Sequence, residues 1–166
     1  MSKISRTIKH LCTTTVAGRR TFPTHTLKAI QDSIAAGEHR HRAQVRLAVE
    51  PALPLQAVLA DTSPRRRARE LFAQYRIWDT EENCGILIYI NLADHKVEIV
   101  ADRTVGRVLS TQDWQAVCQT MTQGFARGAF HESTIAGLQQ LNDLLASGFP
   151  SNGMNSNELS NRPLVL

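Results

Sequence analysis

Two apolar runs in the middle of the chain, separated by a four-residue turn, constrain the fold more than any other feature. The first, residues 85–92 (GILIYINL), is nearly continuous in Ile and Leu, which is typical of a strand covered on both faces. The second, residues 97–101 (VEIVA), follows after residues 93–96 (ADHK). Because so short a connection allows only a hairpin reversal, the sequence predicts a central strand paired antiparallel with its successor.

A third strand is predicted upstream of this hairpin, in residues 43–50 (AQVRLAVE). Apolar residues alternate with polar or small ones along this segment, which ends at Glu50. Residues 64–77 follow as a predicted helix with Ser63 as its cap. Because a strand, a helix and the central strand follow one another, we expect a right-handed crossover in which the strands at 43–50 and 85–92 run parallel.

The rest of the chain is predicted to be mainly helical, and its length fits one domain. Apolar residues spaced three and four apart predict helices at 24–36, 110–125 and 133–146. A chain of 166 residues that is 42% hydrophobic can bury a core of its own. We divide it into a basic segment, 1–20, with a short helix, a single α/β domain, 21–150, and an aperiodic tail, 151–166, which we expect to be flexible.

The net charge of +4 conceals an asymmetry between the two parts of the chain. Residues 1–69 hold 13 Lys and Arg against 4 Asp and Glu, whereas residues 70–166 hold 6 against 11. A basic amino-terminal half can meet an acidic partner or an anionic membrane surface, or it can complement the acidic half inside one fold. The pattern gives no strong signal for nucleic-acid binding.

Cysteine usage and the absence of long apolar runs indicate the compartment. Cys12, Cys84 and Cys118 are irregularly spaced and form no C-x-x-C pair, which predicts free thiols in a reducing compartment. The basic first residues lack the apolar run of a secretory signal, and no run is long enough for a transmembrane segment. We therefore expect a cytoplasmic protein that is monomeric or weakly homodimeric.

Polar residues gather at both edges of the predicted sheet. Ligands of open sheets collect beyond the carboxyl ends of parallel strands, where Glu50, Asn91 and Asp94 are expected. The opposite edge combines the loop before the central strand with Asp102 and Arg103. Its hard oxygen donors, which suit calcium or magnesium, are Asp79, Thr80, Glu81, Glu82, Asn83 and Asp102. The spacing is not that of an EF-hand, and a solvated acidic loop is the alternative.

Several common catalytic and cofactor motifs are missing from the sequence. It contains no G-x-G-x-x-G, P-loop, G-x-S-x-G or H-E-x-x-H pattern, so we expect no nucleotide cofactor and assign no catalytic residue. The sequence therefore leaves open whether the protein is an enzyme.

The chain resembles the TPM domain, the module of the thylakoid lumen phosphatase-like proteins. The resemblance rests on residues 83–89 (NCGILIY) followed by residues 96–103 (KVEIVADR), and it extends from about Leu27 to Pro150. Further positions in matching order are Trp114, Phe125, Gly128, Phe130 and Gly137. Cys84 stands where the family often has a second Asn, and Thr104 where Gly often follows the Arg.

The resemblance implies a three-layer α/β/α sandwich around a small mixed sheet of about four strands. Family members have been linked to divalent metal binding, to weak acid phosphatase activity, and to repair or assembly of membrane protein complexes. Carried over by position, the resemblance implies Asp79, Asn83 and Asp102 as metal-binding residues and Arg103 as an anion or phosphate contact. Glu50 is a further candidate from its strand end.

Three hypotheses about function remain in order of preference. The first is a TPM-domain module that binds calcium or magnesium and acts, with an unidentified protein partner, in assembly or quality control of protein complexes. The second is a metal-assisted, acid phosphatase-like hydrolase of weak activity. The third is an adaptor whose basic amino-terminal half contacts an acidic partner or a membrane surface.

Overall fold

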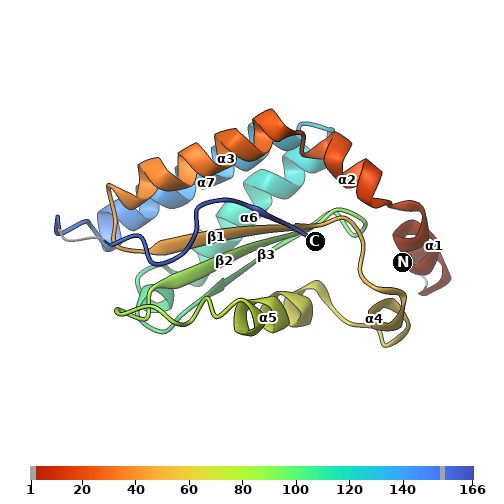
Figure 1. The fold of residues 1–166 in the computed structure, drawn as a ribbon, viewed down its shortest axis with the longest axis horizontal. Coiled ribbons are helices and arrows are strands. Elements are labelled where there is room, and N and C mark those ends of the chain that lie inside the picture. The colour runs from red at the N-terminus through yellow and green to blue at the C-terminus, as the bar shows by residue number, and fades with distance from the viewer. Residues whose placement is uncertain (1–2, 154–155) are drawn as a thin grey trace.

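A four-stranded sheet forms the middle layer of the computed structural model, which describes residues 3–153 and 156–166 (Figure 1). Its strands are β1 (Gln44–Glu50), β2 (Gly85–Asn91), β3 (Lys96–Ala101) and β4 (Leu164–Val165), in the order β3–β2–β1–β4. β1 runs parallel to β2 and to β4, whereas β2 and β3 form an antiparallel hairpin. The structure thus confirms the predicted hairpin and the predicted parallel pair.

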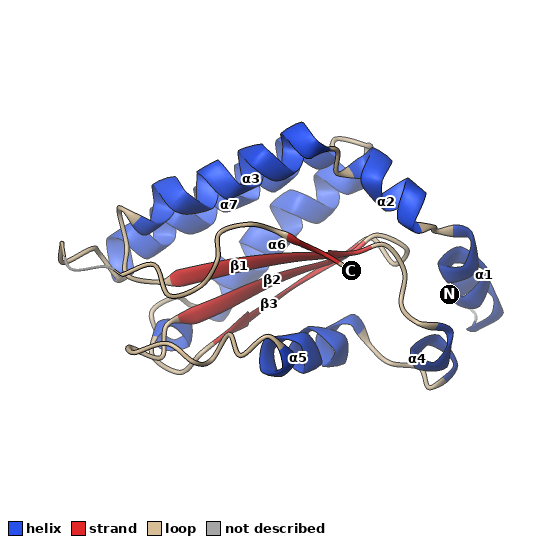
Figure 2. Cartoon of the chain, viewed as in Figure 1, coloured by secondary structure: helices blue, strands red, loops and turns tan. Residues whose placement is uncertain are grey.

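Helices cover both faces of this sheet. They are α1 (Lys3–Cys12), α2 (Thr15–Thr21), α3 (Thr24–Glu38), α4 (Leu55–Leu59), α5 (Pro64–Gln74), α6 (Thr111–Ala126) and α7 (Phe130–Gly148), with a 3-10 turn, η1, at Val105–Arg107. α3, α6 and α7 lie on one face and α5 on the other, as Figure 2 shows. The expected three-layer sandwich is therefore confirmed. Among the described helices, none has both the length and the apolar character needed to cross a lipid bilayer.

Side-chain alternation along the strands divides the core into two parts. Leu47 and Ile88 point to the larger core, which β1 and β2 share with α3, α6 and α7. Ala48, Leu87 and Tyr89 point to the smaller core under α5. Because β2 is covered on both faces, every one of its residues is buried, which is why its sequence is apolar almost throughout.

The helix boundaries follow from local capping and close packing. The Ser63 hydroxyl accepts the Arg66 N–H at the start of α5, and Ser110 and Asp113 form a capping box at the start of α6. α3 does not end at residue 36, as predicted, but continues through Gly37 to Glu38. A Cβ at Gly37 would lie 2.2 Å from Asn142 Oδ1 of α7, so this glycine permits close helix packing instead of ending the helix.

The first and last segments of the chain form helices and a strand that residue spacing predicted only in part. The basic segment forms two short helices, α1 and α2. In the tail, β4 pairs with Ala48 and Val49 of β1, although its sequence shows no strand period. The described part of residues 151–166 lies along β1, and the expected flexibility of this tail stays a prediction.

Candidate functional site

The amino end of β2 meets the end of β3 at one edge of the sheet, where polar residues gather. The Asp102 N–H donates to the Gly85 carbonyl oxygen (2.9 Å), and the Thr104 N–H donates to the Asn83 carbonyl oxygen (3.2 Å). The hairpin ladder therefore brings the segments around residues 83 and 102 side by side. We call the following residues the amino-end rim: Asn83, Asp102, Arg103, Thr104 and Arg107.

A tight turn places Asn83 at this edge. Its N–H donates to the Thr80 carbonyl oxygen (3.1 Å), while the Thr80 hydroxyl accepts the N–H of Cys84 (2.9 Å). The backbone of Asn83 has φ of 52°, in the left-handed region that Asn tolerates better than most residues. The exposed Asn83 side chain thus stands immediately before the buried strand.

The Asp102 carboxylate has one satisfied and one unsatisfied oxygen. Oδ1 accepts the Arg103 N–H at 2.7 Å, whereas Oδ2 is buried and has no hydrogen-bond partner among the described residues. A buried polar atom without a partner is uncommon because its lost hydration is not replaced. The rim therefore contains a buried carboxylate oxygen whose hydrogen-bonding capacity is unused within the described part of the chain.

A pocket of about 310 Å³ lies against the rim. It is lined by Asn83, Arg103, Thr104 and Arg107. Both arginines are exposed, and neither has a carboxylate within salt-bridge distance in the described part of the chain. The lining thus combines an amide and a hydroxyl with two cationic groups, an arrangement suited to an anion.

The acidic loop before β2 adds less to the rim than its sequence suggested. Asp79 is exposed at the start of the loop, where its N–H donates to the Arg76 carbonyl oxygen (2.9 Å). Glu82 pairs with Arg42 (2.5 Å), in the segment before β1. Within residues 3–153 and 156–166, no three His, Cys, Asp or Glu side chains stand together so as to enclose a metal ion. The rim can therefore offer an ion only a few protein ligands.

Glu50 lies at the other end of the sheet. The register pairs Gln44 with Gly85 and Glu50 with Asn91, and a strand rises about 3.3 Å per residue, so Glu50 is roughly 20 Å from the rim. The structure does not bring it together with Asn83 or Asp102.

At this opposite end Glu50 belongs to a buried polar network. Arg67 donates to both of its carboxylate oxygens (2.7 to 3.1 Å), and the Tyr89 hydroxyl donates to Oε2 (2.6 Å). The Asn91 amide donates to the Tyr89 hydroxyl (3.0 Å), and its oxygen accepts the Asp94 N–H (2.9 Å). Burial and the neighbouring Glu50 raise the pKa of Tyr89, so the phenol keeps its proton.

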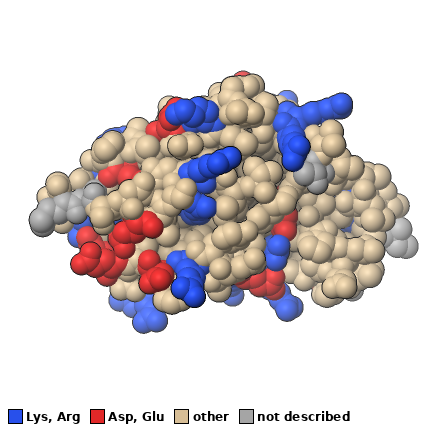
Figure 3. Space-filling view, in the orientation of Figure 1, with Lys and Arg blue, Asp and Glu red and all other residues tan. Residues whose placement is uncertain are grey.

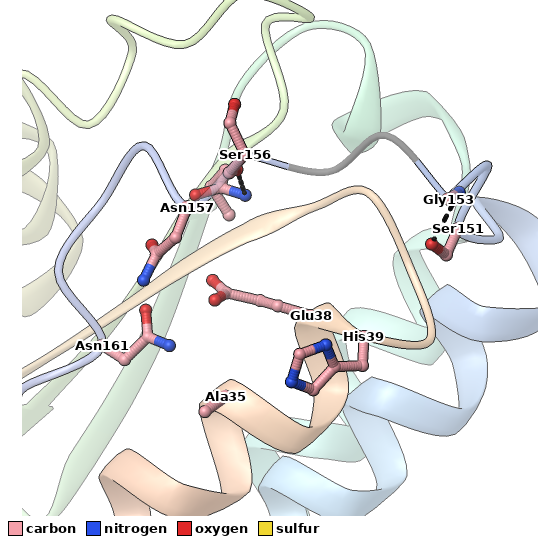
Figure 4. Close-up of a pocket in the computed structure, with 9 residues that line it drawn as sticks. Ala35, Glu38, His39, Ser151, Gly153, Ser156, Asn157 and Asn161 are labelled. Carbon is pink, nitrogen blue, oxygen red and sulfur yellow. Dashed lines mark hydrogen bonds between the residues drawn. The ribbon is translucent and has the colours of Figure 1, made fainter.

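A second polar pocket, of about 390 Å³, lies where the tail passes the end of α3 (Figure 4). The Glu38 side chain points from α3 toward Asn157 and Asn161 of the tail, and one of its oxygens accepts the Val45 N–H (3.1 Å). Burial raises the pKa of Glu38 to about 7, although the hydrogen bonds from Val45 and Asn161 oppose the shift. Glu38 is therefore a buried carboxyl group that titrates near neutral pH.

Sequence reasoning missed this pocket. Glu38 follows the predicted end of a helix, and its neighbours Asn157 and Asn161 come from a tail without periodicity. A carboxylate at the end of a helix is usually solvated, so only the position of the tail reveals that Glu38 is buried. The one available signal was the amide-rich composition of the tail.

Comparisons with known proteins agree with the fold described above. The family model of the TPM domain matches residues 18–144. The NMR structure of the BA42 protein from the psychrophilic bacterium Bizionia argentinensis superimposes with a TM-score of 0.75 over 86% of this chain and 93% of that chain. The two sequences are 23% identical, so this likeness concerns the fold. No curated protein matches the chain.

Proposed function

Since the chain belongs to the TPM domain family, we propose that its amino-end rim binds a divalent cation, calcium or magnesium, together with an anionic group of a protein partner. In this function the protein is a binding module in the assembly or quality control of protein complexes. The ion would be held by Asp102 and Asn83, and the anionic group by Arg103 and Arg107.

The observation that carries this proposal is the buried Oδ2 atom of Asp102, which has no hydrogen-bond partner in the described part of the chain. A carboxylate oxygen in this state gains most from a cation, because the cation replaces the lost hydration. The amide oxygen of Asn83, on the segment paired with residues 102–104, is a second hard ligand of the kind that calcium and magnesium prefer.

The small number of protein ligands suggests how an anion would take part. Magnesium in particular keeps several waters and is often held by one or two carboxylates plus phosphate oxygens. The pocket beside the rim presents Arg103 and Arg107, neither neutralised by an acid among the described residues. A phosphate or carboxylate there would complete the coordination of the ion and be held by both guanidinium groups.

Calorimetric titration tests this proposal. Magnesium chloride is titrated into the protein alone and into the protein saturated with O-phosphoserine, and we expect the ion to bind about tenfold more tightly in the second case. Asp102→Asn removes the charged ligand and is expected to abolish this gain. Asp143→Asn, which alters an exposed aspartate of α7 that pairs with Arg40, is the matched control and should behave as the wild type.

The same samples separate binding from hydrolysis. Release of phosphate from O-phosphoserine that requires the metal and disappears in Asp102→Asn would favour the hydrolase over the binding module. Equal magnesium affinity in the wild type and in Asp102→Asn would show that the rim is not the metal site.

A further inference from the structure

Helix α1 is amphipathic, but its polar face is turned inward, the reverse of the usual arrangement in a surface helix. Arg6 and His10, one helical turn apart, face the body of the protein, and their side chains are 14% and 2% exposed. Ile8 and Leu11 lie on the opposite side of the helix and are 55% and 62% exposed. The helix therefore presents apolar side chains to the solvent.

Hydrogen bonds to the rest of the fold hold α1 in this orientation. The Arg6 guanidinium donates to both carboxylate oxygens of Asp94 (2.9 to 3.2 Å) and to the Thr62 carbonyl oxygen (2.8 Å). His10 Nδ1 accepts the Leu53 N–H (3.0 Å), and its Nε2 lies 3.2 Å from Asp94 Oδ1. Burial would raise the pKa of Asp94, but its contacts with Arg6 outweigh this effect and lower it. Turning the apolar face of α1 inward would leave this carboxylate without its cation.

Further apolar side chains are exposed at the same end of the molecule. α4 packs against α1, and α2 follows α1 directly, so the three helices gather at the right of Figure 1. Val16 of α2 is 60% exposed, and Leu55 and Leu59 of α4 are 48% and 68% exposed. We call these three residues, with Ile8 and Leu11, the apolar end. It contains five of the seven large apolar residues exposed in the described part of the chain, so the exposure is concentrated, as at interaction surfaces.

Basic side chains border the apolar end. Lys9 of α1 and Arg19 and Arg20 of α2 are exposed, whereas Asp61, an exposed acidic residue that follows α4, pairs with Arg6 (3.2 Å). In Figure 3 the visible face of this end is mostly free of charged side chains, and Lys and Arg lie along its upper border. An exposed apolar helix face flanked by basic residues is the composition that partitions into the interface of an anionic membrane.

We propose that the apolar end docks onto an anionic lipid surface, with α1 lying in the membrane interface. None of the pockets described above is lined by its residues. Joining two copies through this end would gather Lys9, Arg19 and Arg20 of both copies around one interface, which like charge opposes. Docking through this end leaves the amino-end rim at the far end of the sheet, directed away from the lipid.

Vesicle flotation with the full chain tests the proposal. Vesicles of phosphatidylcholine alone are compared with vesicles that also contain phosphatidylglycerol as the anionic lipid. We expect binding to the anionic vesicles only, and we expect it to weaken when salt shortens the Debye length from about 10 Å to about 3 Å. The double variant Ile8→Gln, Leu11→Gln should bind about tenfold more weakly, because it removes the apolar contacts with the lipid.

Two further variants make the result specific. Trp78→Gln changes an apolar side chain that is 49% exposed in the loop near the amino-end rim, and it should bind vesicles as the wild type does. The triple variant Lys9→Gln, Arg19→Gln, Arg20→Gln removes three positive charges and keeps the apolar residues. It should lose most of its binding to anionic vesicles. Circular dichroism confirms that each variant is folded. The proposal is overturned if the wild type does not float with anionic vesicles, or if the apolar double variant floats as well as the wild type.

Discussion

At the scale of single residues, Glu38 is the group whose chemistry depends most on the fold. It is 8% exposed, and burial raises its pKa to about 7 from an ordinary value of 4.5. Between these values the folded protein binds more protons than the unfolded chain, so stability falls as the pH rises through this window. The contribution of Glu38 is therefore most favourable below about pH 4.5 and is lost above about pH 7.

Glu38→Gln should remove this pH dependence. The glutamine oxygen can still accept the Val45 N–H, but the side chain cannot ionise. We expect the variant to be more stable than the wild type by about 1 to 3 kcal/mol above pH 7, with the difference shrinking as the pH falls. Urea unfolding from about pH 5 to about pH 9 measures it. Glu81→Gln, in an exposed loop, is the control, and parallel curves for the wild type and Glu38→Gln would contradict the prediction.

The residue scale also shows where sequence reasoning reaches its limit. Spacing predicted that Asn83 and Asp102 share an edge, because a hairpin fixes which ends of its strands meet. Spacing could not predict that Arg67, within a basic run on a helix, turns to Glu50. A helix period shows which residues share a face, but it does not show which side chain of the sheet that face will cover.

At the scale of elements, Gly85 allows the start of β2 to lie close to the backbone of Ile77, in the segment that follows α5. A Cβ at this position would lie 1.8 Å from the Ile77 carbonyl oxygen, which belongs to the backbone and cannot rotate away. We expect Gly85→Ala to destabilise the protein by about 3 kcal/mol or more, because β2 would have to shift within two packed layers.

Gly106→Ala is the matched control for this prediction. A Cβ at Gly106 would be no closer than 3.6 Å to its nearest neighbour, and the residue has no positive φ. Its effect on stability should stay within about 1 kcal/mol. Urea unfolding of both variants gives the comparison, and similar midpoints for the two would show that the contact between Gly85 and Ile77 is relaxed at little cost.

The sequence correctly predicted strands in which apolar residues recur at a regular spacing and a helix that begins at a recognisable cap. β1, β2 and β3 carry strand patterns, and α5 begins after Ser63, the cap that the sequence marked. β4 could not be found in this way, since two residues have no period and pair only because β1 has a free edge. The inward polar face of α1 was also hidden, because it depends on Asp94, far away in the sequence.

At the scale of the whole molecule, ion pairs within the fold account for part of the charge asymmetry. Ion pairs join the basic first half to the acidic second half: Arg6 with Asp94, Arg40 with Asp143, Arg42 with Glu82 and Arg65 with Glu98. Internal complementation thus accounts for several of the basic residues. Lys9, Arg19 and Arg20 have no such partner among the described residues, and they are the ones that border the apolar end.

The tail lies along the edge of strand β1, which gives it a structural role. Gln44 Oε1 accepts the N–H groups of Glu158 (2.7 Å) and Leu159 (3.1 Å), and the Leu166 N–H donates to the Val49 carbonyl oxygen (3.0 Å). The tail thereby covers the edge of β1, which would otherwise expose unpaired backbone groups.

Amide hydrogen exchange on the full chain decides between this arrangement and the flexible tail expected from composition. If the tail is held, the amides of Glu158, Leu159 and Leu166 should exchange at least about 100-fold more slowly than unstructured amides, and the exposed Gly153 amide should not. Gln44→Ala removes the acceptor of two of these bonds, so Glu158 and Leu159 should lose protection while Leu166 keeps it. Rapid exchange at all three positions of the wild type would mean that the tail is mobile. The edge of β1 and the pocket around Glu38 would then be open to solvent.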